Sequence, residues 1–282
     1  MSRRPPLGQH FLRDPKVLTQ IVDALAPAPG DVVLEIGAGP GALTVVLAPR
    51  VQRVIAIERD RRLAKDCGLR IADCGLGNVD VVEGDALKLD WHALIESTPT
   101  NPQSAIRNPQ FPIANPQFKV VGNIPYAITS PLIDQALTPP LPERIVFLVQ
   151  REVADRLAAR PGSRAYGALS VGVQATCRVE RLFGVRAGAF HPAPQVASAL
   201  VRLTPRPDPV VTPAETRAFR AFVTACFTRR RKQLRNVVMA ATGRPAAAVL
   251  AGLAQLGLDP VARPETLAPE QFVRLLRWGR GL

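Results

Sequence analysis

The stretch Asp31–Gly41 reads DVVLEIGAGPG, and it decides the fold. Its first half is a short run of β-branched and aliphatic residues, which is typical of a strand buried on both faces. Its second half, Gly37–Gly41, is a glycine-rich turn that leads directly into a helical pattern. A buried strand, a glycine turn and a helix in this order are typical of the first unit of a doubly wound parallel sheet.

The same pattern recurs along the first two thirds of the chain. Short apolar runs alternate with amphipathic segments, and their continuous apolar character indicates parallel strands covered by helices on both faces. The sequence therefore predicts an α/β, Rossmann-like domain over residues 1–204. We expect its further strands at residues 53–58, 79–83, 118–122 and 144–149, with two more at 169–179 and 197–203.

The remainder of the chain has a different pattern. Four prolines in Thr204–Pro213 predict a linker, because proline removes a backbone donor and fixes its own φ angle. Beyond it the pattern is helical, with breaks at residues 243–245 and 257–260. We therefore predict a smaller all-α domain over residues 205–282.

One segment of the first domain differs from its surroundings. In residues 97–117 the tripeptide Asn-Pro-Gln recurs at positions 101, 108 and 115. A proline in every repeat excludes a continuous helix. We predict a low-complexity, extended or disordered surface insertion between a helix and the next strand, which carries no information about the chemistry.

Composition limits the class of partner. The chain of 282 residues has 36 Lys+Arg and 23 Asp+Glu, a net charge of +13, and more than half of this excess lies in residues 214–282. Such a balance favours an anionic partner, of which nucleic acid is the commonest.

No apolar run approaches the ~18 residues of a membrane helix, and Met1–Leu12 lacks the apolar core of a secretory signal. The three histidines and four cysteines have no metal-ligand spacing. We expect a cytoplasmic monomer without a metal.

Two features at predicted strand ends indicate a nucleoside ligand. Gly37 and Gly39 allow a tight turn and a close approach of a ligand to the backbone. Glu58 ends the next strand about 20 residues on, where an acid can bind a ribose. The structural alternatives are an ordinary tight turn and a solvated acid. Together with Ala42 the glycines also satisfy the dinucleotide-binding pattern G-x-G-x-x-A. These features therefore do not exclude an enzyme that binds a dinucleotide.

Two further strand ends carry polar side chains. Asp85 can accept a hydrogen bond from an adenine amino group, or it can cap a helix. The string Asn123-Ile124-Pro125-Tyr126 offers an amide oxygen and a main-chain carbonyl that can accept both hydrogens of an aromatic amine. Pro125 fixes the turn, and Tyr126 offers a ring on which a base can stack. A turn with an aromatic plug is the alternative for these four residues in isolation.

An ordered set of motifs resembles the small-subunit ribosomal RNA adenine N6,N6-dimethyltransferases of the KsgA/RsmA type. The resemblance covers nearly the whole chain apart from the insertion. It rests on residues 8–12 (GQHFL), 34–44 (LEIGAGPGALT), 57–60 (IERD), 84–86 (GDA), 122–126 (GNIPY), 150–157 (QREVADRL), 165–170 (AYGALS), 190–196 (FHPAPQV) and 229–236 (RRRKQLRN).

The resemblance implies S-adenosylmethionine as the methyl donor and N6 of two adjacent adenosines near the 3′ end of 16S ribosomal RNA as the target. It implies that Glu58 binds the donor's ribose and Asp85 its adenine. Asn123 and the Ile124 carbonyl would hold the target N6, Tyr126 would stack on the base, and Phe190 is a candidate for the opposite face. The implied donor site is His10, Leu12, Gly37, Gly39, Glu58, Asp85 and Asn123. Family members usually have Asn where this chain has His10.

The densest cationic run is a candidate RNA-binding site. A charge run is often only a solvated helix face, but in a chain that handles RNA it favours phosphate contacts. Its members are Arg229, Arg230, Arg231, Lys232 and Arg235.

Three other functions compete with dimethylation of small-subunit RNA in ribosome biogenesis. A large-subunit (23S) RNA adenine methyltransferase of the antibiotic-resistance type shares the motifs, but the arginine-rich C-terminal segment favours the small subunit. A ribosome-assembly or transcription protein without catalysis would not require the intact string Asn123–Tyr126. A nicotinamide oxidoreductase would leave both that string and the basic segment unexplained.

Overall fold

The structure is a computed structural model that describes residues 10–97, 118–125 and 128–281. The chain forms two compact units, one of Met1–Ala154 with Glu180–Thr204 and one of Asp155–Val179 with Pro205–Leu282. The sequence prediction placed residues 155–179 with the sheet. In the structure they belong to the helical unit, because Tyr166, Val171 and Ala175 are buried in its core.

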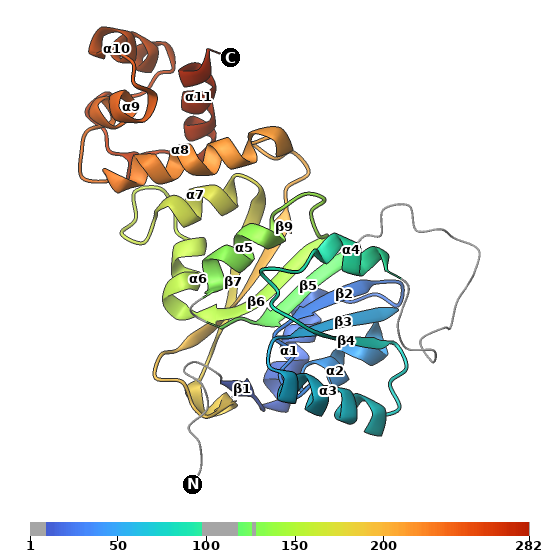
Figure 1. Ribbon diagram of the computed structural model, residues 1–282. Coiled ribbons are helices and arrows are strands. Elements are labelled where there is room, and N and C mark those ends of the chain that lie inside the picture. The colour runs from blue at the N-terminus through green and yellow to red at the C-terminus, as the bar shows by residue number, and fades with distance from the viewer. Residues whose placement is uncertain (1–9, 98–117, 126–127, 282) are drawn as a thin grey trace. The chain divides into compact units, whose positions relative to one another are not determined.

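The first unit is built on a mostly parallel sheet (Figure 1), which confirms the predicted α/β class. Strands β2 to β6 are parallel, and β9 runs antiparallel to β6. Across the sheet the seven strands are β4 (Val79–Glu83), β3 (Arg53–Glu58), β2 (Val32–Ile36), β5 (Phe118–Asn123), β6 (Arg144–Gln150), β9 (Ser198–Pro205) and β7 (Cys177–Val185).

Strand β2 marks the point where the strand order reverses. The chain continues from β2 to β3 and β4 on one side, and then crosses to β5 and β6 on the other. Ile36 pairs with Ile57 in β3 and with Gly122 in β5, so the three strands end level with one another. In open α/β sheets this reversal at the carboxyl ends opens the crevice where ligands bind.

Three helices of the first unit begin at an aspartate that caps them. Asp14, Asp60 and Asp90 each accept hydrogen bonds from two backbone N–H groups at the starts of α1, α3 and α4, which satisfies donors that a helix leaves unpaired. The helices are α1 (Pro15–Leu25), α2 (Thr44–Leu47), α3 (Arg61–Asp73), α4 (Trp91–Glu96), α5 (Thr129–Ala136) and α6 (Arg151–Leu157), with 3-10 turns η1 (Ala48–Arg50) and η4 (Ala187–Ala189).

A small antiparallel ribbon accompanies the main sheet. Strand β1 (Phe11–Leu12) pairs with β8 (Phe190–His191), with Phe11 opposite His191. The ribbon brings the start of the described chain to the segment that precedes β9.

The predicted strand at 169–179 is wrong for most of its length. Ala168–Gln174 forms helix α7, and only from Cys177 does the chain become β7. Helical contacts determine the structure of this segment: the Ser170 hydroxyl accepts a hydrogen bond from the Gly167 N–H at the start of α7. Gln174 donates to the carbonyls of Leu157 and Ala159, which end the preceding helix.

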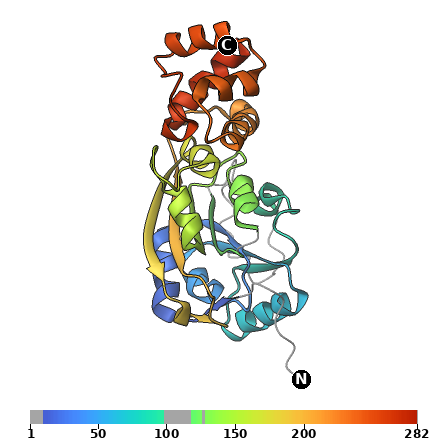
Figure 2. The ribbon, with the colours of Figure 1, turned by 90° about the vertical axis from the view of Figure 1, so that its left-hand side faces the viewer.

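The second unit is helical, as predicted for the C-terminal region. Figure 2 shows its last four helices gathered into one group: α8 (Thr216–Thr228), α9 (Leu234–Thr242), α10 (Ala246–Gln255) and α11 (Pro269–Arg280), with 3-10 turns η5 (Pro213–Glu215) and η6 (Pro264–Thr266). Their apolar faces form one core that includes Phe219, Leu253 and Phe272.

Among the described residues no single helix is long and apolar enough to cross a membrane. The pair α9 and α10 meets the length and composition requirement only when joined, with a 115° bend between the helices. Val237, Val249 and Leu253 of this pair are 0% exposed within the helical core.

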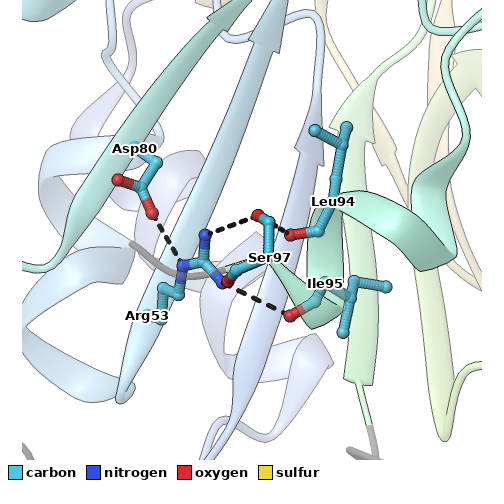
Figure 3. A network of polar contacts seen from close by, with 5 residues as sticks. All are labelled: Arg53, Asp80, Leu94, Ile95 and Ser97. Atoms are coloured by element: carbon cyan, nitrogen blue, oxygen red, sulfur yellow. Dashed lines mark hydrogen bonds and ion pairs between the residues drawn. The ribbon is translucent and has the colours of Figure 1, made fainter. Parts of the chain in front are cut away.

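A polar network at the amino edge of the sheet holds the chain where the insertion begins (Figure 3). Arg53 Nε donates to Asp80 Oδ2 at 2.7 Å, and Arg53 Nη1 donates to the carbonyl of Ser97 at 2.8 Å. The chain is described again at Phe118, which pairs with Val32 at this same edge. The insertion itself lies outside the described residues apart from Ser97, and both of its attachment points are at the edge opposite the carboxyl ends of the strands.

Because the predicted insertion is anchored away from those carboxyl ends, shortening it is expected to be tolerated. Phe118 and Arg53 both pair with Val32, which places them about 10 Å apart. Replacing residues 98–117 by a Gly/Ser linker of half the length is expected to raise the free energy of unfolding by about 0.6 kcal/mol through the smaller entropy of loop closure. Urea denaturation measures this, and a loss of stability would mean that the insertion packs against the sheet.

Candidate functional site

Four of the predicted site residues follow neighbouring strands at one edge of the sheet. Gly37 follows β2, Glu58 ends β3, Asp85 lies just beyond β4, and Asn123 ends β5. Because β4, β3, β2 and β5 are adjacent and parallel, these four residues come together at the switch point. The site residues that the sequence predicts at separate strand ends thus lie next to one another along one edge of the sheet.

The glycine turn needs glycine for both conformation and space. Gly37, Gly39 and Gly41 have φ angles of +71°, +56° and +78°, which side chains disfavour. A Cβ on Gly39 would lie 3.2 Å from the Phe11 ring. The N–H groups of Gly37 and Ala38 both donate to the carbonyl of Ile57, at 2.9 and 3.1 Å. The turn is therefore fixed at the end of β2, and three of its five residues have no side chain.

Glu58 is buried, and the turn itself holds it in place. Its side chain is 6% exposed. Oε2 accepts a hydrogen bond from Gly39 N–H at 2.8 Å, and Oε1 accepts one from Asp60 N–H at 2.8 Å. A carboxylate has about four acceptor sites, so each oxygen keeps capacity for a further donor such as a ribose hydroxyl.

Asp85 is more open than Glu58. One carboxylate oxygen accepts a hydrogen bond from Leu87 N–H at 3.1 Å, and the other lies 4.0 Å from Arg59 Nη1. The Asp85 side chain is 24% exposed. One oxygen of Asp85 thus caps the turn that follows β4, which is the structural alternative that the sequence offered for this residue. The second oxygen can still accept a hydrogen bond from a ligand at the edge of the site.

Asn123 is oriented by a contact that the sequence did not indicate. Its Nδ2 donates to the main-chain carbonyl of His10 at 2.8 Å. The His10 ring in turn lies with Nδ1 2.8 Å from the carbonyl of Pro192. With the amide nitrogen engaged, the Oδ1 atom of Asn123 is the end of the side chain that is left to accept a hydrogen bond from a ligand.

This contact does not depend on the side chain at position 10. The bond to Asn123 uses the backbone of His10, which any residue provides. No pattern of side chains predicts such a bond, because it links positions that are far apart in the sequence.

The other predicted residues near Asn123 have different surroundings. Ile124 is 1% exposed and its N–H donates to the Leu148 carbonyl at 3.0 Å, which fixes the turn after β5. The carbonyl of Pro125 accepts a hydrogen bond from Ile128 N–H. Tyr126 lies outside the described residues. Leu12 and Phe190 pair across the β1–β8 ribbon and are 6% and 5% exposed, so both rest in the hydrophobic core.

The cationic run lies in the connection between α8 and α9, not along a helix face. Arg229, Arg231 and Lys232 are exposed there, and Arg235 is exposed in the first turn of α9. Arg230 differs: its Nε donates to Glu265 at 2.6 Å and its Nη2 donates to the Arg164 carbonyl at 3.0 Å. Arg230 therefore joins three segments of the helical unit.

Arg230 also brings further cations to the run. Exposed Arg164 precedes Tyr166, and exposed Arg263 precedes η6, which carries Glu265. The link from Arg230 to Glu265 and to the Arg164 carbonyl places both arginines beside the α8–α9 connection. Sequence reasoning missed them, because the proximity arises only from tertiary contacts.

Replacing Arg230 by glutamine is expected to lower the free energy of unfolding by about 1 kcal/mol, because two charge-assisted hydrogen bonds are lost from a position that solvent partly screens. Replacing the exposed Arg229 by glutamine is expected to change it by less than about 0.5 kcal/mol. Urea denaturation of the two variants measures the difference, and equal stabilities would contradict the structural role of Arg230.

Among the described residues no group of three His, Cys, Asp or Glu side chains gathers as a metal site would require. The candidate site consists of carboxylates, one amide and backbone groups. Such groups can accept hydrogen bonds from the hydroxyl and amino groups of a ligand.

Comparison with known proteins identifies the family. The model of the family described as ribosomal RNA adenine dimethylase matches residues 1–279. A protein of Nitratidesulfovibrio vulgaris (strain Hildenborough) named ribosomal RNA small subunit methyltransferase A is 39% identical over 274 residues, which cover 95% of this chain and 93% of the relative. A protein of the same name from Chromohalobacter salexigens is 40% identical and covers 98% of this chain and 93% of its own.

Solved structures agree with this result. A dimethyladenosine transferase from Plasmodium falciparum is 29% identical, with a TM-score of 0.79 over 94% of this chain and 96% of that chain. The 23S rRNA methyltransferase ErmE is 30% identical, with a TM-score of 0.70 over 95% of this chain and 98% of that one. Because the family model and the relatives span nearly the whole sequence, the chain belongs to the ribosomal RNA adenine dimethylase family.

Proposed function

We propose that this protein transfers methyl groups from S-adenosylmethionine to N6 of two adjacent adenosines near the 3′ end of 16S ribosomal RNA, within the small ribosomal subunit. The observation that carries the proposal is the orientation of Asn123 at the switch point. Its Nδ2 atom is engaged by the His10 carbonyl at 2.8 Å, which directs Oδ1 to act as an acceptor. An acceptor at this edge suits the amino group of an adenine.

The residues at the other strand ends fit S-adenosylmethionine. The three glycines of the Gly37–Gly41 turn offer backbone without side chains, and Glu58 keeps acceptor capacity for ribose hydroxyls beside it. Asp85 offers a carboxylate oxygen for the adenine amino group. When bound, S-adenosylmethionine supplies a methyl group that its sulfonium already activates. The protein residues therefore need to bind, align and exclude water, and alignment alone can account for much of a rate enhancement.

The target amino group is a poor nucleophile, because its lone pair is delocalised into the ring. Asn123 Oδ1 and the Ile124 carbonyl would accept its two hydrogens and favour a pyramidal nitrogen. The N–H of Ile124 bonds to Leu148, which holds this peptide in place. The base must leave its stack to reach the site, and we assign Tyr126 to stack on it, with Phe190 as the candidate for its other face.

Double methylation follows from the same two acceptors. The first transfer replaces one N–H by a methyl group, so the monomethylated nitrogen still offers one hydrogen to an acceptor. A site that relies on two separate acceptors can therefore readmit the monomethylated base.

The helical unit would hold the RNA. Arg229, Arg231, Lys232 and Arg235 are exposed cations at the α8–α9 connection, and phosphate contacts of this kind dominate the affinity for nucleic acid. Arg164 and Arg263 extend this surface, which we call the basic surface. We further propose that the unit of residues 1–154 and 180–204 performs the chemistry, that the unit of residues 155–179 and 205–282 provides most RNA contacts, and that the protein acts as a cytoplasmic monomer.

The alternative substrate is the large ribosomal subunit, because the chain is also similar to the 23S rRNA methyltransferase ErmE. The names of the relatives in Nitratidesulfovibrio vulgaris and Chromohalobacter salexigens favour the small subunit. Incubating the protein with labelled S-adenosylmethionine and undermodified small subunits, large subunits or free RNA separates the two. Label is expected on small subunits, and equal labelling of large subunits would overturn the assignment.

A further inference from the structure

A half-buried aromatic residue without an assigned role lies against the glycine turn. Phe11 is the first residue of β1. Its ring rests on Gly39, because a Cβ on this glycine would lie 3.2 Å from Cδ1 and 3.3 Å from Cε1 of the ring. Glycine has no side chain, so it lets an aromatic edge come this close to the backbone. The ring of Phe11 therefore sits directly on the turn to which we assign the donor.

The same residue adjoins the contact that orients Asn123. The carbonyl that accepts the hydrogen bond from Asn123 Nδ2, at 2.8 Å, belongs to the peptide unit that joins His10 to Phe11. A peptide unit is planar and rigid, so the position of Phe11 determines where this carbonyl lies. Phe11 thus contacts the turn with its ring and holds Asn123 through its own peptide unit.

The turn does not need Phe11 for its own position. Two of its N–H groups donate to the carbonyl of Ile57, and a third, that of Gly39, donates to the Glu58 carboxylate at 2.8 Å. Both acceptors belong to β3 in the main sheet. The turn is therefore held by the sheet, and the ring of Phe11 takes its position from the turn.

The β1–β8 ribbon, in contrast, depends on side-chain contacts for its place at the site. Its two strands form a sheet of their own, in which Phe11 lies opposite His191 and Leu12 lies opposite Phe190. Successive side chains of a strand point to opposite faces. Leu12 is 6% exposed and belongs to the hydrophobic core, whereas Phe11 points the other way, to the turn. Leu12 therefore anchors the ribbon to the core, and Phe11 sets its place relative to the turn.

We propose that Phe11 is a positioning residue for methyl transfer, whose ring takes its place from Gly39 and whose peptide unit aligns Asn123 Oδ1 with the donor. This inference rests on the proposed function, because it assumes that the turn binds S-adenosylmethionine and that Asn123 holds the target amino group. Phe11 touches neither substrate in this account. It relates the position of the side chain that holds the target to the surface that supports the donor.

The rate of methyl transfer at saturating substrates tests this role. Phe11→Ala removes the ring and is expected to lower the single-turnover rate about 10- to 100-fold, because a misplacement of about 1 Å at a reacting group can cost this much. Donor affinity, measured by calorimetric titration, is expected to stay at the wild-type value, because the turn keeps its own hydrogen bonds. Phe11→Leu retains a carbon at the Cδ1 position and is expected to recover most of the rate.

A double variant tests whether Phe11 acts through Asn123. Once the amide is gone, the loss of the ring has no side chain left to misalign. Phe11→Ala combined with Asn123→Ala is therefore expected to transfer methyl groups at the rate of Asn123→Ala alone. Losses that multiply would mean that the two residues act independently, and this result would overturn the proposal. A weakened donor affinity with an unchanged rate would also overturn it, because Phe11 would then be a donor contact.

Phe183 provides the matched control. It is a half-buried phenylalanine of β7 that packs against the same hydrophobic core as Leu12, and it belongs to neither substrate site. Phe183→Ala is expected to lower stability in urea while its transfer rate stays at the wild-type value. Equal rates of Phe11→Ala and Phe183→Ala would contradict the positioning role. Phe11→Val, which suits a strand but is too short to reach Gly39, replaces Phe11→Ala in every comparison if the alanine variant does not fold.

The wild-type protein distinguishes a failure of this inference from a failure of the proposed function. A wild type that transfers no methyl group to small subunits would refute the proposed function. A wild type that methylates them, with Phe11→Ala just as fast, would count against the role of Phe11 alone.

Discussion

Replacing Asn123 by alanine is expected to lower the rate of methyl transfer at saturating substrates by about 100- to 1,000-fold, the usual cost of removing one preorganised polar contact at a reacting group. The physical reason is that Asn123 Oδ1 is the side-chain acceptor aligned at the end of β5, where the His10 carbonyl holds Nδ2 at 2.8 Å. Without it the target amino group is held by the Ile124 carbonyl alone. Single-turnover methylation of undermodified small subunits measures the rate.

A second asparagine of the first unit provides the matched control. Asn78 donates to the carbonyls of Ala48 and Val51 just before β4 begins, at the amino edge of the sheet. Asn78→Ala removes two partly buried hydrogen bonds but no group of the site, so it is expected to lower stability while the transfer rate stays at the wild-type value. An Asn123→Ala protein with the transfer rate of Asn78→Ala would contradict the role assigned to Asn123.

Reversing two charges of the basic surface is expected to weaken binding to the small subunit more than any other surface change. Arg229→Glu with Arg231→Glu removes two exposed cations and adds two anions. The expected loss is at least 100-fold near physiological salt, because each lost phosphate contact removes its counterion release and each new anion repels the RNA. Donor affinity is expected to stay unchanged. Filter binding of particles at several salt concentrations measures both the loss and a shallower salt dependence.

The control applies the same change of charge elsewhere in the helical unit. Arg217 in α8 and Arg274 in α11 are exposed, and neither belongs to the basic surface. Arg217→Glu with Arg274→Glu is expected to weaken particle binding far less. Equal losses in the two double variants would mean that net charge alone, and not a defined surface, holds the RNA.

Much of the sheet was predictable because most of its strands are continuous apolar runs. The predicted strands at residues 53–58 and 79–83 coincide with β3 and β4, since continuous apolar runs between helical patterns leave few alternatives. Helix α7 was not predictable in this way. Its valines alternate as they would in a strand. The segment is nevertheless a helix, because Ser170 and Gln174 form hydrogen bonds with backbone carbonyls at the end of α6.

The candidate site was predictable in its residue types and strand ends but not in its supporting contacts. The glycine turn, Glu58 and Asp85 follow from the position of each motif at the end of a strand. The bond from Asn123 to the His10 backbone joins distant positions and involves no side chain of His10. Tertiary contacts likewise separate Arg230 from its neighbours in the basic run, because Glu265 engages its guanidinium group.

The nucleoside product of the reaction tests the central claim most directly. Undermodified small subunits are incubated with the protein and S-adenosylmethionine, and the 16S ribosomal RNA is then digested and analysed by mass spectrometry. The account predicts N6,N6-dimethyladenosine at two adjacent positions near the 3′ end, and far less of it with Asn123→Ala after the same short incubation. Methylation of another base, or of large-subunit RNA in its place, would contradict it.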